Sequence, residues 1–136
     1  MTTKPYARFK MLVSANAALN ARIADFVAAA DEISAEYIRR NGYSQKPSTH
    51  RADYISDKWV RVVTIDHYEN FPSRDSSVYA FICLKDGQTK TLGQLFEGDI
   101  HKPASFKAPA KVARGNVFKD DFRSALTPHG IVYLRG

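Results

Sequence analysis

The chain has 136 residues, of which 44% are hydrophobic and 25% are charged. These proportions are typical of one soluble globular domain, and they exclude a disordered chain and a chain built of membrane spans. Lysine and arginine outnumber aspartate and glutamate by 20 to 14, which gives a formal net charge of +6. The sequence therefore predicts a single domain over residues 1–136 whose field favours anionic partners such as phosphates, nucleotides or nucleic acid.

The first predicted element is a helix over residues 14–41. Ser14 and Asn16 are suitable N-caps, and two arginines followed by Asn-Gly, ending at Gly42, are typical of a helix C-terminus. Residues 5–12 could form a preceding helical turn, and a break near Asp31 would make the whole a helical hairpin. Apolar side chains recur at three- and four-residue steps and so share one helix face: Leu19, Ile23, Phe26, Val27, Ala30, Ile33 and Tyr37.

Residues 43–57 contain proline, serine and threonine and show no apolar period, which predicts a connection. It would join a helical part, residues 1–45, to a β-rich part, residues 55–136. The predicted fold class is α+β, with an N-terminal helix or helical hairpin packed on a C-terminal antiparallel sheet.

Two segments in the second part are rich in β-branched and aromatic residues, 58–67 and 76–84. The loop over residues 70–75 between them predicts a β-hairpin. Further strands are expected within residues 92–100 and over residues 131–134.

The segment 97–118 contains the densest positive charge in the chain. Residues 102–117 include two stiffening prolines and no acidic residue. A short helix over residues 108–115 would place Lys111 and Arg114 on neighbouring faces, where a diphosphate could bridge them; a solvated basic surface is the alternative. The basic residues of the segment are Lys102, Lys107, Lys111 and Arg114.

Three side chains in or near this segment suit a nucleotide. The planar guanidinium of Arg114 matches the oxygens of a phosphate. Asp99 follows Gly98 and is either the acid of a hairpin turn or an acceptor for ribose hydroxyls. Phe81 lies mid-strand and is either a core residue or a stacking platform for a purine.

At these residues the sequence resembles the first type of phage Thoeris anti-defence sponges, which capture a nucleotide immune signal without degrading it. The resemblance covers the C-terminal part of the chain closely and the helical part only in general layout. The matching segments are Tyr-Ala-Phe-Ile at 79–82, Gly-Asp-Ile at 98–100, residues 102–111, Ala-Arg-Gly-Asn at 113–116 and Tyr-Leu-Arg at 133–135.

The resemblance implies a helical hairpin on an antiparallel sheet, assembled as a dimer or hexamer with ligand near the subunit interfaces. The ligand would be a glycocyclic ADP-ribose isomer, and some members also capture cyclic trinucleotides of the CBASS defence system. Phe81 would contact the base, Asp99 the sugar and Arg114 the phosphates. Glu97 departs from the asparagine expected before Gly-Asp. The predicted ligand-binding residues are Phe81, Asp99, Lys102, Lys107, Lys111, Arg114 and Asn116.

The sequence contains no nucleophile elbow, Gly-rich phosphate loop, metal-ligand cluster or paired-histidine motif. We therefore expect a non-catalytic protein with no catalytic residue, no metal and no cofactor. The single cysteine, Cys83, excludes an internal disulfide and lies in an apolar run typical of a core.

No apolar segment has the length of a signal-peptide core or a membrane span, which predicts a protein of the bacterial host cytoplasm with no membrane partner. The alternative function is that of a small basic nucleic-acid-binding phage protein. The positive charge and the interleaved Phe106 and Phe118 favour that alternative.

Overall fold

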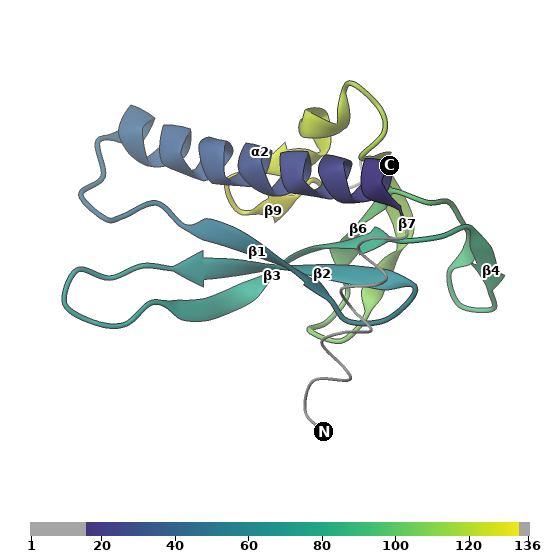
Figure 1. Ribbon diagram of the computed structural model, residues 1–136. Coiled ribbons are helices and arrows are strands. Elements are labelled where there is room, and N and C mark those ends of the chain that lie inside the picture. Colours follow the sequence, from purple (N-terminus) through teal and green to yellow (C-terminus); the bar gives the residue numbers. More distant parts are fainter. Residues whose placement is uncertain (1–15, 134–136) are drawn as a thin grey trace.

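A computed structural model describes residues 16–133, in which one long helix packs on a five-stranded antiparallel sheet (Figure 1). The predicted α+β fold class is confirmed. The predicted turn over residues 5–12 and the end of the predicted final strand lie outside the described residues. The elements are α2 (Ala17–Asn41), β1 (Thr49–Tyr54), β2 (Trp59–Asp66), β3 (Arg74–Cys83), β4 (Gly87–Thr89), β5 (Gly93–Leu95), β6 (Asp99–Pro103), β7 (Pro109–Asn116), the 3₁₀ turn η1 (Phe122–Ala125), β8 (Leu126–Thr127) and β9 (Gly130–Ile131).

Helix α2 begins and ends where the sequence predicts. The side chain of Asn16 accepts a hydrogen bond from the backbone N–H of Leu19, and Gly42 ends the helix in the left-handed conformation at φ +66°. The helix is continuous through Asp31, so the alternative of a break there is wrong. Four residues of the predicted face are buried, whereas Val27, Ile33 and Tyr37 are only half-buried. The buried residues of the helix are Leu19, Ile23, Phe26, Ala29, Ala30, Ser34 and Ile38.

The strand order in the sheet is β1-β2-β3-β6-β7, and every neighbouring pair is antiparallel. The small hairpin of β4 and β5 is inserted between β3 and β6 and extends from the end of the sheet (Figure 1). The predicted hairpin of β2 and β3 is confirmed. Strands β1 and β7 form the two edges, so the basic segment lies on an edge strand.

The core lies between α2 and one face of the sheet. Phe26 contacts the ring of Tyr79 edge-on, at a centroid distance of 6.1 Å. The C-terminal elements η1, β8 and β9 lie beside the helix and complete this layer, and the Tyr79 hydroxyl donates to the carbonyl of Thr127 at 2.7 Å. Burying each large apolar side chain here stabilises the fold by about 1.5–3 kcal/mol. Cys83 is buried, as predicted.

Two segments differ from the sequence predictions. Residues 49–54, expected within a connection, form β1, whose outward side chains are charged: Arg51 pairs with Asp53 and also with Asp75 of β3. Residues 109–116, expected to be helical, form β7. Pairing with β6 overrides the local helix propensity there, and a proline at the first residue of an edge strand is tolerated.

His50 connects β1 to the helix. Its side chain is buried, Nδ1 donates to Asp31 Oδ1 at 2.8 Å, and the ring contacts Tyr79 edge-on. Burial lowers the pKa of His50 from its ordinary value of 6.5, although the bond to Asp31 partly opposes that shift.

We predict that His50 makes stability pH-dependent. Because its pKa is lower in the folded state, the unfolded chain binds more protons just below pH 6.5. The free energy of unfolding is therefore fully retained above that pH and falls as the pH decreases through it, with a slope of at most about 1.4 kcal/mol per pH unit. Urea unfolding between about pH 7.5 and 5.5 measures this slope. His50→Gln should flatten it and the exposed control His129→Gln should not; equal slopes in all three proteins would contradict the assignment.

Candidate functional site

Asp99 and Asn116 face each other across the pair of β6 and β7. Asp99 Oδ1 accepts from the Asn116 side-chain amide at 3.0 Å, and Oδ2 accepts from the backbone N–H of Phe96 at 3.0 Å. The Asn116 amide also donates to the carbonyl of Glu97 at 2.9 Å, and its oxygen accepts from the N–H of Phe118. Both predicted residues thus hold the turn before β6 in place.

Gly98 is the residue that allows this turn. Its φ is +88°, a conformation that L-residues rarely adopt. An added Cβ would lie 2.8 Å from Asn116 Oδ1 and 2.9 Å from a ring carbon of Phe118. The predicted strand within residues 92–100 is consequently divided into β5 and β6, with the turn between them.

A pocket of about 390 Å³ opens beside this turn, and we call it the Phe96 pocket. The ring of Phe96 is 55% exposed, whereas Asp99 is only 9% exposed and lies deeper. Lys119 is exposed at the rim. The pocket therefore offers an aromatic face, a cation and hydrogen-bonding groups in one place. Its lining residues are Phe96, Asp99, Ala113, Gly115, Asn116 and Lys119.

The start of α2 lies at the same end of the molecule as β6 and β7 (Figure 1). Arg22 in its second turn donates to the carbonyl of Phe118 at 3.2 Å and lies 3.8 Å from Asp120. No acidic residue occupies the first helical turn. Because Arg22 is paired with Asp120, Lys119 is the basic side chain that the Phe96 pocket offers to an anion.

Lys102 and Arg114 contact a different part of the chain. Lys102 Nζ donates to the carbonyl of Ile131 at 2.9 Å, and Arg114 Nη1 donates to the carbonyl of Val132 at 2.8 Å. Lys102 Nζ also lies 4.0 Å from the ring centre of Tyr133. Both cations hold residues 131–133 and neither lines the Phe96 pocket.

The predicted helical spacing of Lys111 and Arg114 is wrong. Because β7 is extended, the two residues are separated by about 10 Å along the strand rather than placed side by side on a helix. Lys111 is exposed in β7, and Lys107 is exposed in the loop before it. A diphosphate bridge between Lys111 and Arg114 on one helix surface is therefore not available.

Phe81 lies in the middle of the sheet, on the face opposite α2. It pairs with Arg61 on one side and with His101 on the other, and its ring contacts Trp59 edge-on at 6.2 Å. Its exposed fraction is 0%, so its ring presents no surface to a ligand in this conformation. Of the two alternatives, Phe81 is the core residue and not an exposed stacking platform in this structure.

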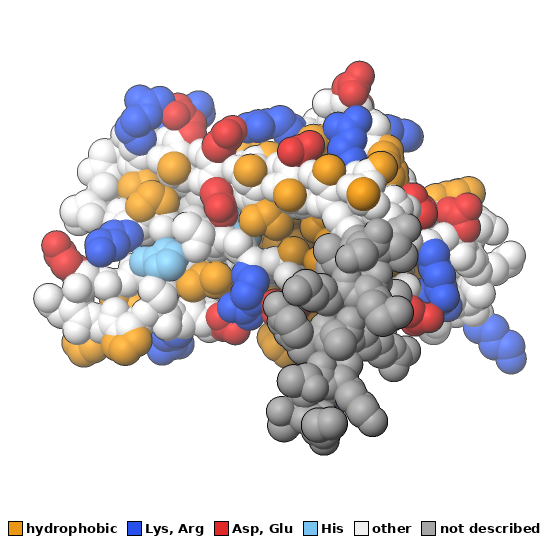
Figure 2. Space-filling model, viewed as in Figure 1, with side chains coloured by type: hydrophobic (Ala, Val, Ile, Leu, Met, Phe, Trp, Pro, Cys, Tyr) orange, Lys and Arg blue, Asp and Glu red, His pale blue; other side chains and the backbone are white. Residues whose placement is uncertain are grey.

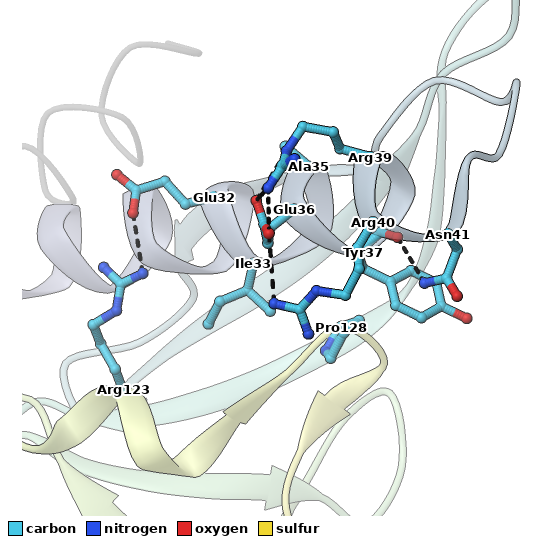
Figure 3. Close-up of a pocket in the computed structure, with 10 residues that line it drawn as sticks. All are labelled: Glu32, Ile33, Ala35, Glu36, Tyr37, Arg39, Arg40, Asn41, Arg123 and Pro128. Atoms are coloured by element: carbon cyan, nitrogen blue, oxygen red, sulfur yellow. Dashed lines mark hydrogen bonds and ion pairs between the residues drawn. The ribbon is translucent and has the colours of Figure 1, made fainter.

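A larger groove of about 880 Å³ lies between the second half of α2 and the turns around Arg123 and Pro128 (Figure 3). Glu36 binds both Arg39 and Arg40, and Glu32 binds Arg123 at 3.0 Å. These pairs neutralise most of the charge in the groove. Sequence reasoning assigned the two adjacent arginines only to the helix end and did not identify the groove.

The net charge of the chain is not concentrated on the face in Figure 2, where lysine and arginine side chains are spread singly around the molecule. Within residues 16–133, no three His, Cys, Asp or Glu side chains group as metal ligands would. The described part of the chain also has no helix of the length and hydropathy that a membrane crossing needs.

The sequence analysis did not identify Phe96 or Lys119. Phe96 falls within a segment expected to be a strand, and Lys119 follows the basic segment. The sequence did contain one signal for Phe96. This aromatic residue lies two positions before Gly98-Asp99, and a turn at that glycine leaves its ring exposed.

We predict that Gly98 holds the pocket together. Gly98→Ala should lower the free energy of unfolding by about 2 kcal/mol more than Gly93→Ala does, because Asn116 and Phe118 must move. Gly93 is a matched control: its φ is +72°, but nothing lies within 4 Å of an added Cβ. Urea unfolding measures the free energy of unfolding of both variants. Equal losses in the two would show that the close approach of an added Cβ to Asn116 and Phe118 does not affect stability.

Comparison with known proteins gives one match. No curated protein and no solved structure matches the chain. Residues 13–129, nearly the whole sequence and every residue of the Phe96 pocket, match a family described as a family of unknown function (DUF7717). The chain therefore belongs to the DUF7717 family.

Proposed function

We propose that the protein is a phage anti-defence protein that binds and sequesters a cyclic nucleotide immune signal without cleaving it. The first ligand class is a glycocyclic ADP-ribose isomer, and cyclic oligonucleotides of CBASS are the second. We further propose that it acts in the cytoplasm of the bacterial host as a homo-oligomer. The observation that carries the proposal is the Phe96 pocket, where Asp99 and Asn116, both in the segments that resemble the sponges, lie with an exposed aromatic ring and a lysine.

The groups of the pocket match the parts of a nucleotide. The half-exposed ring of Phe96 suits stacking with a base, and Lys119 suits a phosphate. Asp99 accepts one hydrogen bond at each carboxylate oxygen, which leaves further acceptor capacity for ribose hydroxyls. A volume of about 390 Å³ is within the usual range for small-molecule sites.

Sequestration needs only tight binding with slow release. A low off-rate lowers the free concentration of a signal as effectively as turnover would when the protein is abundant. The sequence supports this role because it contains none of the recognisable nucleophile, phosphate-loop or metal motifs.

We predict that glycocyclic ADP-ribose binds at the Phe96 pocket. Phe96→Ala and Lys119→Gln should each weaken binding by about ten- to hundredfold, because stacking and a charge-assisted phosphate contact are each worth about 1–3 kcal/mol. Isothermal titration measures the affinities. Lys90→Gln, an exposed lysine in the turn between β4 and β5, is the charge-matched control and should bind as the unsubstituted protein does.

The same complex tests sequestration. After heat denaturation, mass spectrometry should recover the intact ligand. No heat of binding for the unsubstituted protein would refute the proposed ligand, recovery of cleaved products would refute sequestration, and unchanged affinity in both pocket variants would place the site elsewhere.

Nucleic-acid binding has one supporting observation. The guanidinium of Arg61 lies 4.3 Å from the ring centre of Phe106, which is 57% exposed, and Lys107 and Lys111 are exposed nearby in sequence. Such a basic aromatic surface suits a single strand.

If this surface binds nucleic acid, a mobility-shift series should show affinity that falls steeply as salt rises from 50 to 200 mM, at about ten- to a thousandfold for three to five phosphate contacts. Phe106→Ala should weaken that binding and leave nucleotide binding unchanged. Binding that tolerates salt, or none at all, rejects this function.

A further inference from the structure

Residues 131–133 form what we call the C-terminal strap. Ile131 is buried and belongs to β9, and the N–H of Val132 donates to the carbonyl of Ala125 at 3.0 Å. Tyr133, by contrast, is 78% exposed. The strap is thus anchored in the core at Ile131 and exposed to solvent at Tyr133.

Two cations on neighbouring strands hold this strap. Lys102 of β6 reaches the carbonyl of Ile131, and Arg114 of β7 reaches the carbonyl of the next residue, Val132. Lys102 also contacts the exposed ring of Tyr133. The two cations therefore bind two consecutive carbonyl acceptors of one chain.

The partners of these two cations are all neutral. No ion pair among residues 16–133 includes Lys102 or Arg114, although Arg22, Arg39, Arg40, Arg51, Lys85 and Arg123 each pair with an acid. Both side chains are half-buried, so water solvates them only in part. Because a phosphate binds a lysine or arginine more strongly than a carbonyl does, an anion is a better partner here than the strap.

One of the two cations adjoins the Phe96 pocket along the chain. Arg114 lies in β7 between Ala113 and Gly115, and both neighbours line that pocket. A nucleotide held at Phe96 could place its phosphates toward β7.

We propose that Lys102 and Arg114 form a diphosphate-binding site that the C-terminal strap occupies in the absence of ligand. This inference rests on the proposed function, because the diphosphate is that of the captured signal. Ligand and strap compete for the same two cations, so the observed affinity equals the intrinsic affinity multiplied by the fraction of molecules whose strap is open. Weakening the exposed end of the strap therefore tightens binding without adding a contact.

The test is titration of the full chain with glycocyclic ADP-ribose and with inorganic pyrophosphate. Tyr133→Ala removes the ring contact with Lys102 and should tighten binding of both probes by about threefold, the expected weight of an exposed cation–π contact. Tyr43→Ala, an exposed tyrosine beyond the end of α2, is the matched control and should change neither affinity. Arg114→Gln should weaken both probes by at least about tenfold.

The double variant Tyr133→Ala/Arg114→Gln separates competition from a general effect. In the Arg114→Gln background, Tyr133→Ala should increase the affinity for the two probes clearly less than it does when Arg114 is present. In ¹⁵N spectra of the unsubstituted protein, the amides of Val132 and Tyr133 should shift on addition of either probe, because the strap leaves its carbonyl contacts.

The outcomes distinguish this inference from the proposed function. If glycocyclic ADP-ribose binds but Tyr133→Ala changes nothing and the Val132 amide does not shift, the strap inference is overturned and the proposed function stands. If pyrophosphate shifts the strap and binds more tightly to Tyr133→Ala while glycocyclic ADP-ribose does not bind, the site is supported and the proposed signal is overturned. If neither probe binds any variant, both are overturned.

Discussion

The backbone of Gly98 joins three strands, and the candidate site depends on that junction. Its N–H donates to the carbonyl of Cys83 at the end of β3, and its carbonyl accepts from the N–H of Val117 just after β7. These two bonds fix where β6 starts, and so fix Asp99 opposite Asn116. An ordinary side chain cannot be placed at this position because the backbone conformation and the neighbouring Asn116 and Phe118 both oppose it. The pocket therefore exists because the two backbone hydrogen bonds of Gly98 join β3, β6 and β7 at this end of the sheet.

The parts of the fold that the sequence predicted are those with local signals. Helix α2 has an N-cap, a periodic apolar face and a C-terminal Asn-Gly, all of which act within a few residues of one another. Strands β2 and β3 combine apolar β-branched residues with a polar loop. Strand β1 was missed because its outward residues are charged, and the ion pair that ties Arg51 to the rest of the sheet is with Asp75 of β3, on the far side of β2.

The basic segment shows why local propensity was misleading for the site. Alanine, lysine and arginine favour a helix, but β7 gains its backbone hydrogen bonds from β6, which no local pattern reveals. Asp99 and Asn116 do meet in a pocket, while Phe81 is enclosed within the sheet. Lys102 and Arg114 contact residues 131–133, which are 29 and 18 positions away for the two hydrogen bonds. Charge density alone could therefore not show which groups the two cations bind.

The long-range contacts of α2 have a consequence for biosynthesis. The helix leaves the ribosome early, yet much of what covers its apolar face comes from η1, β8 and β9, and its charged face reaches Arg123. The nascent chain therefore carries an incompletely covered amphipathic helix until residues beyond about 120 have been translated. During that interval part of the face of Leu19, Ile23 and Phe26 stays exposed, and the final core closes only after translation of these C-terminal elements.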